Sequence, residues 1–256
     1  MLISFASLLL AFGPPVVLSH FKSITFSAVQ QCGNFSVNFS GGQVPSSLPL
    51  TLTVVPFNST PIFIEIPISS WNTTTLTGAS VTFLPFPADI EFVASLDDAN
   101  GVGTGPVSDV IRVDPSDNSS CIPQVSSTPA SRYTVDTPFA QCAPVDVRYD
   151  TNIVDTPPTI RAFVPRNASF FLNQTDVSNT AGQASFTMDA LQGQQVVLLL
   201  SDDAGFKGTT DLLAVGGNSS SPTSCLPTPM SRQNNHHGHS SAPTPTPTPS
   251  KGSLSK

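Results

Sequence analysis

Two short stretches of this chain, NSSCIP at residues 118–123 and TSCLP at 223–227, share the order Ser-Cys-aliphatic-Pro. Each closes a long segment that opens with Gln-Cys, at residues 31–32 and 141–142. When the first Gln-Cys is aligned on the second, a shift of 110 residues, the two halves stay in step with small gaps. The four cysteines therefore mark the beginning and the end of each copy of an internal duplication.

The strongest match between the halves is LDDANGVGTGPVSDVIRV (96–113) with SDDAGFKGTTDLLAV (201–215). Both contain Asp-Asp-Ala, then glycines, an Asp and an aliphatic triplet that ends in Val. We place repeat 1 at residues 20–123 and repeat 2 at 132–227, with a linker at 124–131.

Each repeat contains a series of short apolar segments with Pro, Gly and Asn between them, which predicts β-strands. Phe35, Val37 and Phe39 alternate with polar residues, as expected of a half-buried strand. In repeat 1 we expect strands at residues 23–28, 34–39, 50–55, 62–66, 79–83, 90–96 and 110–113. In repeat 2 we expect them at 133–136, 145–149, 159–164, 169–172, 184–188, 195–200 and 212–215. This density of strands is typical of an immunoglobulin-like β-sandwich. We therefore predict an all-β fold with two such sandwich domains in tandem.

Four cysteines allow three pairings, and the predicted strands favour one of them. If the strands alternate in direction, the start of the second strand and the end of the seventh lie at the same pole of a sandwich. Cys32 and Cys142 precede a second strand, whereas Cys121 and Cys225 follow a seventh. Only Cys32–Cys121 with Cys142–Cys225 makes each repeat a closed unit.

The composition indicates a secreted chain. Only 11% of residues are charged, against about 25% in an average soluble protein. Residues 1–19 are largely apolar and predict a signal peptide that is cleaved before His20. The net charge of −7 argues against nucleic acid or an anionic membrane as a partner.

Potential N-glycosylation sites agree with secretion, because Asn-x-Ser/Thr triplets recur along both repeats. They start at Asn34, Asn38, Asn58, Asn72, Asn118, Asn167, Asn173 and Asn218. The two on the strand at 34–39 should point away from the apolar face, about 13 Å apart at about 3.3 Å per residue.

The C-terminal segment differs in kind. Residues 228–256 hold alternating Pro and Thr and no apolar run, which predicts a disordered, O-glycosylated tail. No apolar run of membrane-spanning length follows the N-terminal one, so this sequence predicts no transmembrane helix and no anchor-attachment signal.

With these features the chain resembles a group of fungal, mostly basidiomycete, secreted two-repeat proteins related to the Ser/Thr-rich, GPI-anchored cell-wall family. The resemblance rests on Cys32 and Cys142, on Asp98 to Gly101 and Asp202 to Gly205, and on Ser-Cys at 120–121 and 224–225. It covers residues 20–227 and implies tandem β-sandwiches at the cell surface, without an established reaction or ligand. Such proteins often continue into a membrane anchor, whereas this sequence ends in SKGSLSK. Either the protein is released or the sequence is incomplete.

Few residues are candidates for a metal-binding or catalytic site. The pairs Asp97-Asp98 and Asp202-Asp203 are candidate calcium ligands, but a turn in which Asp caps and Gly takes positive φ is the favoured interpretation. A mature N-terminal His20 would be a candidate copper ligand, yet His236, His237 and His239 all lie in the tail.

The remaining candidates are weaker still. The glutamates Glu65 and Glu91 are expected to face outward on strands, and nothing places them together for glycosidic cleavage. Trp71 is expected to pack on the sandwich, with stacking on a sugar as the alternative.

We therefore predict no catalytic residues and no cofactor. The predicted function is that of a non-enzymatic glycoprotein of the fungal cell surface or wall, in contact with wall polysaccharide or other surface glycoproteins. The alternatives are a polysaccharide-binding module and, third, a copper-binding protein or oxidase that uses His20.

Overall fold

The computed structural model describes residues 21–71, 78–81, 83–123, 132–178 and 181–226. The predicted signal peptide, linker and tail, together with Asn72 and the four histidines, lie outside these residues. The described residues belong to one compact unit in which strands alternate with turns and loops. None of the described helices is long and apolar enough to cross a membrane.

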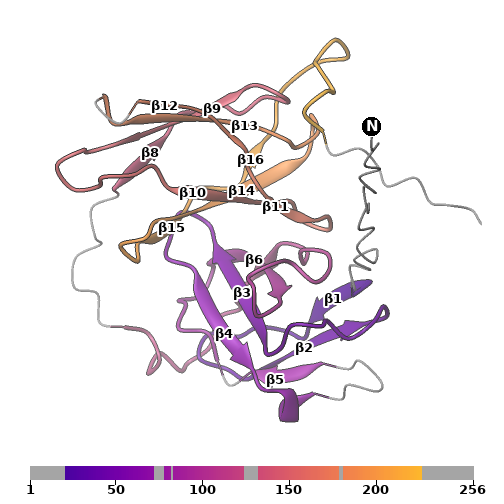
Figure 1. Ribbon diagram of the computed structural model, residues 1–256. Coiled ribbons are helices and arrows are strands. Elements are labelled where there is room, and N and C mark those ends of the chain that lie inside the picture. Colours follow the sequence, from indigo (N-terminus) through magenta and orange to yellow (C-terminus); the bar gives the residue numbers. More distant parts are fainter. Residues whose placement is uncertain (1–20, 72–77, 82, 124–131, 179–180, 227–256) are drawn as a thin grey trace, which may run out of the picture. The chain divides into compact units, whose positions relative to one another are not determined.

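Repeat 1 folds into two antiparallel sheets (Figure 1). The three-stranded sheet has the order β1-β2-β5, and the four-stranded sheet has the order β4-β3-β6-β7. The strands are β1 Ser23–Phe26, β2 Phe35–Ser40, β3 Leu50–Pro56, β4 Ile62–Ile66, β5 Ala79–Val81, β6 Glu91–Asp97 and β7 Ile111–Arg112. A short 3-10 helix, Ile68–Ser70, follows β4.

Repeat 2 repeats this arrangement with additional strands. One sheet has the order β8-β9-β13-β12; in the other, β11-β10-β14-β15 are neighbours and β16 also pairs with β14. The strands are β8 Tyr133–Val135, β9 Pro144–Tyr149, β10 Thr159–Phe163, β11 Ser169–Phe171, β12 Gln174–Ser178, β13 Gln183–Thr187, β14 Gln195–Ser201, β15 Lys207–Thr209 and β16 Leu213–Ala214. This division of strands between two sheets is the immunoglobulin-like pattern.

Each pair of sheets encloses its own hydrophobic core. In repeat 1 the inward side chains of β2, including Val37 and Phe39, pack with Leu52 of β3 and Phe92 of β6. In repeat 2 an equivalent core joins Val147 and its neighbours on β9 to the inward residues of β10 and β14. Because the core residues come from both sheets, each repeat is a β-sandwich.

Both predicted disulfides are present. Cys32–Cys121 and Cys142–Cys225 each join Cα atoms 5.5 Å apart. The first cysteine of each pair has a positive φ, 55° at Cys32 and 54° at Cys142. The chain-entropy model gives about 4–5 kcal/mol of stabilisation for closing a loop of either length. Each disulfide ties the second strand of its sandwich to the segment after the last.

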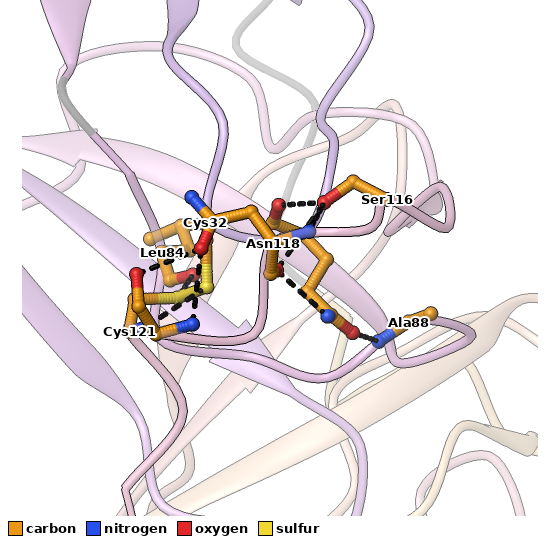
Figure 2. Close-up of a disulfide and its surroundings, with 8 residues drawn as sticks. Cys32, Leu84, Ala88, Ser116, Asn118 and Cys121 are labelled. Carbon is orange, nitrogen blue, oxygen red and sulfur yellow. Dashed lines mark hydrogen bonds between the residues drawn. A yellow bond between two sulfur atoms is a disulfide. The ribbon is translucent and has the colours of Figure 1, made fainter.

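The glutamine before each of these cysteines, which the sequence alone did not explain, braces the closing segment. Gln31 donates from Nε2 to the carbonyl of Asn118 and accepts the N–H of Ala88 at Oε1. Figure 2 shows Asn118 and Ala88 beside the Cys32–Cys121 disulfide. Gln141 plays the same part in repeat 2, since it donates to the carbonyl of Pro222 and accepts the N–H of Gln192. The glutamine of each Gln-Cys motif thus stabilises the segment around its disulfide through side-chain hydrogen bonds to the backbone.

All fourteen predicted strands are found, with ends shifted by at most two residues. Two strands of repeat 2 were not predicted. β12 is exposed along its whole length and has no apolar alternation, and β15 is a three-residue Lys-Gly-Thr segment. Neither carries the pattern that identifies a half-buried strand.

Candidate functional site

Four strands are buried on both faces, which a single sandwich does not require. In β3, Leu52 and Val54 point into the core of repeat 1, whereas Val55 belongs to a separate apolar cluster. That cluster also contains Val93 of β6 and, from repeat 2, Phe163 of β10. Its other buried members are Val107, Val197 and Leu199. The outward faces of the β3–β6 and β10–β14 strand pairs therefore pack against each other between the two repeats.

Backbone hydrogen bonds join the two repeats beside this apolar cluster. The turn after β3 donates from the N–H of Asn58 to the carbonyl of Thr210, at 2.8 Å. The carbonyl of Ser59 accepts the N–H of Thr209, at 3.1 Å. Asn58 has a positive φ of 51° in this turn.

The same pair of hydrogen bonds recurs with the repeats exchanged. The turn after β10 donates from the N–H of Arg166 to the carbonyl of Ser108, at 3.1 Å, and the carbonyl of Asn167 accepts the N–H of Val107, at 2.6 Å. Arg166 also has a positive φ, of 61°. Each repeat thus offers the same turn to the same segment of the other. Reciprocal contacts of this kind are those of a two-fold symmetric dimer interface, here formed within one chain.

An ion pair breaks this symmetry. Arg161 of β10 donates from Nη1 and Nη2 to the two carboxylate oxygens of Asp97 of β6, at 2.6 and 2.7 Å. The side chains of Arg161 and Asp97 are only 7% and 4% exposed. Thr53 and Ser95 donate their hydroxyls to the same carboxylate, at 2.6 and 2.8 Å. The buried carboxylate is therefore fully hydrogen-bonded, as a buried charge has to be.

The structure changes the alignment of the two Asp-Asp-Ala motifs, in which the sequence matched Asp97 with Asp202. Asp98, not Asp97, is the counterpart of Asp202, because each caps its turn by accepting the N–H of the residue four positions later. Strand register makes Asp97 the counterpart of Ser201, since they pair with Thr51 and Thr159 at equivalent points of their sheets. Repeat 2 therefore has no second buried carboxylate at this place.

A turn follows Asp97 and another includes Asp202 and Asp203, and Asp97 itself lies at the end of β6 rather than in the turn. Gly101 and Gly205 have φ of 76° and 87°, as the predicted turn requires. Asp97 is held by Arg161, Asp98 and Asp202 cap their turns, and Asp203 is exposed. In the described ranges no group of three or more His, Cys, Asp or Glu side chains is placed to hold a metal ion.

The two glutamates lie apart, as the sequence indicated. Glu65 and Glu91 are both exposed, as expected. Glu65 pairs through Thr51 with the Asp97 end of β6, whereas Glu91 begins that strand. Six residues of strand separate these ends, about 20 Å at about 3.3 Å per residue. This exceeds the spacing of about 5–10 Å that glycosidic cleavage by two carboxylates uses.

Trp71 is buried in the core of repeat 1, where its ring packs against Phe21 and Phe39. It is therefore not available to stack on a sugar. The asparagines of the described glycosylation triplets are all exposed: Asn34, Asn38, Asn58, Asn118, Asn167, Asn173 and Asn218. Asn34, just before β2, and Asn38 on β2 alternate with the buried Phe35, Val37 and Phe39, as predicted.

Beside the ion pair lies a groove of about 320 Å³ that both repeats line. Its floor includes Arg161 and Asp97, and its walls include Phe63 of β4 and Phe171 of β11. Phe63 and Phe171 hold the same position in their repeats, and 41% and 52% of them are exposed. The ammonium of Lys207 lies 3.9 Å from the centre of the Phe63 ring. Sequence reasoning missed this groove, because it treated the repeats as separate units.

No model of a known protein family matches the chain, and no curated protein matches it. The solved structures with weak similarity to this chain include the following two. A biofilm-associated protein BSP domain is 11% identical with a TM-score of 0.26, and the match covers 78% of this chain and 30% of that one. The FN1–FN3 domains of chicken CNTN1 are 10% identical with a TM-score of 0.24, over 77% of this chain and 67% of that one. The chain spans under a third of the length of the biofilm-associated protein. Neither similarity bears on function.

Proposed function

We propose that this chain is a secreted, N-glycosylated, non-enzymatic protein of the fungal cell surface or wall, with a structural or adhesive role. In this proposal two immunoglobulin-like domains are followed in the sequence by a Thr/Pro-rich segment. Two disulfides and no free cysteine among the described residues support passage through an oxidising compartment. The exposed sequon asparagines support glycosylation there. The fungal assignment rests on the resemblance of the sequence.

The observation that carries the structural role is the packing between the repeats. Reciprocal backbone hydrogen bonds, a shared apolar cluster and a buried ion pair hold two disulfide-closed sandwiches as one unit. Within the described residues, the acidic side chains near this interface are used for capping and ion pairing. Such a unit resists hinging between repeats, which suits a protein that has to keep a fixed geometry outside the cell.

Localisation tests this proposal. An epitope inserted after Gly101, in an exposed turn, should be accessible to antibody on intact cells of the source organism. Immunoblots of medium, detergent extract and glucanase-released wall should find the chain in one or more of these fractions, with a mass that falls after glycosidase treatment. Recovery from the cytosol alone, with four free thiols, would overturn the proposal.

A polysaccharide-binding module is the second candidate, and the groove between the repeats favours it. The copper hypothesis depends on His20, which lies outside the described residues.

A further inference from the structure

We infer that the groove between the repeats binds a neutral sugar ring, as one unit of a glycan chain. The groove joins Phe63, Phe171 and Lys207 to the Asp97–Arg161 ion pair and to the hydroxyls of Thr51 and Ser201. The inference concerns ligand chemistry and does not depend on where the protein is located.

The two phenylalanines supply exposed apolar surface in the groove, beside the Lys207 ammonium, 3.9 Å from the centre of the Phe63 ring, and the Arg161 guanidinium, 5.7 Å from that of Phe171. Both lie in edge strands, β4 and β11, and half or nearly half of each residue is exposed. Their counterpart positions bring them to the same groove from different repeats. Exposed aromatic faces at a concave site bind the apolar C–H face of a ring by burial and by attraction to its polarised hydrogens.

Three polar side chains line the same groove. The hydroxyls of Thr51 and Ser201 and the ammonium of Lys207 make no hydrogen bond or carboxylate ion pair with any described residue. They offer donors and acceptors in a groove whose floor is rigidly held by the Asp97–Arg161 pair. A few convergent polar groups beside apolar walls are the usual composition of a small-molecule site.

Charge decides which ring is preferred. The lining holds two carboxylates, Asp97 and Asp98, and two cations, Arg161 and Lys207, so its formal charge is zero. Because these charges cancel, the lining gives an acidic or a basic ring no net attraction to offset the loss of water from its charge. A neutral polyhydroxylated ring carries no such cost. The volume of about 320 Å³ is at the lower limit of about 300–1,000 Å³ for small-molecule sites, which favours one or two rings over a larger ligand.

Titration calorimetry on the full secreted chain tests this inference. Before titration its own N-glycans are trimmed to single residues, because Asn167 and Asn173 flank β11 and their sugars would compete. The probes are a β-1,3-glucan hexasaccharide, chitohexaose, an α-mannan hexasaccharide and a charged oligogalacturonate. The first two represent wall polysaccharide, and the mannan represents glycoprotein glycans. We expect at least one neutral probe to bind and the galacturonate to bind more weakly.

Substitutions locate the binding. Phe63→Ala and Phe171→Ala should each weaken the binding of the neutral probe at least fivefold. Thr51→Val should also weaken binding, because it removes the hydroxyl while keeping a side chain of similar size and shape. Phe83→Ala is the matched control, because Phe83 is 44% exposed but does not line the groove. Circular dichroism checks that the variants fold. The inference is overturned if no neutral probe binds, if the galacturonate binds best, or if Phe83→Ala weakens binding as much as the groove variants do.

Discussion

Replacing Arg161 with methionine should destabilise the protein strongly, although it removes a single charge, because that charge is buried between the two repeats. The substitution deletes two hydrogen bonds to Asp97 and one each to Ser169, to Ser95 and to the carbonyl of Gly101. It leaves the Asp97 carboxylate buried, with only the hydroxyls of Thr53 and Ser95 donating to it. Breaking a buried pair by removing one partner costs about 3–5 kcal/mol, and the two remaining donors place the expected loss near the lower value.

The chain carries its own probes for this measurement. Its single tryptophan, Trp71, lies in the core of repeat 1, and its two tyrosines, Tyr133 and Tyr149, lie in repeat 2. Urea unfolding followed by tryptophan fluorescence and by tyrosine circular dichroism therefore reports on each repeat separately. With a slope of about 3 kcal/mol/M, the midpoint should fall by about 1 M or slightly more. The wild-type transitions should coincide, because the repeats share an interface.

A double variant and a surface control test whether the buried ion pair stabilises the interface. Arg161→Met combined with Asp97→Leu replaces the pair by apolar side chains and should recover most of the stability, since buried pairs exchanged for apolar groups are often neutral. Arg112→Met breaks the exposed pair with Asp89 and should leave the midpoint unchanged. If Arg161→Met behaves like Arg112→Met, or if the two substitutions at the buried pair are simply additive, the pair does not hold the interface.

Three further predictions follow from local features. Cys32→Ser with Cys121→Ser should lower the unfolding free energy by about 4–5 kcal/mol, seen first in the Trp71 signal; an unchanged midpoint would show that the disulfide is dispensable. Gly101→Ala should cost about 1–2 kcal/mol because φ is +76° with open space around the new Cβ, so the loss reflects backbone conformation alone; a neutral result in thermal unfolding would contradict the turn. Burial raises the pKa of Asp189, so the folded state favours its neutral form. Its stabilising contribution is present in acid and lost as pH rises through the raised pKa. Asp189→Asn should therefore raise the melting temperature at pH 7 but not in strong acid, and equal shifts at both pH values would refute this.

The strands and disulfides could be predicted because their signals are local. Alternation in β2 and the matched Gln-Cys and Ser-Cys motifs fix which residues are buried and where each repeat closes. The turn glycines Gly101 and Gly205 were identifiable for the same reason, since positive φ restricts the residue type.

The interface between the repeats could not be predicted in this way. Its members, such as Val55, Val93 and Phe163, are residue types that are common in any strand. Their positions in the sequence do not show whether a strand face is covered by the other repeat or exposed to solvent. One signal was present, because neither β6 nor β14 alternates as a half-buried strand would. Residues 196–200 of β14 read VVLLL, and residues 92–96 of β6 read FVASL, with only Ser95 polar. The buried partner of Asp97 lies 64 residues away, beyond any local pattern.

The central claim, that the two sandwiches pack on each other, can be tested by cutting the chain between them. A protease site placed within residues 124–131, which lie outside the described structure, would be cleaved with both disulfides intact. We expect the two halves to elute together in gel filtration and to separate when Arg161→Met is added. Separate elution of the wild-type halves at micromolar concentration would show that the repeats are independent, and would contradict the account.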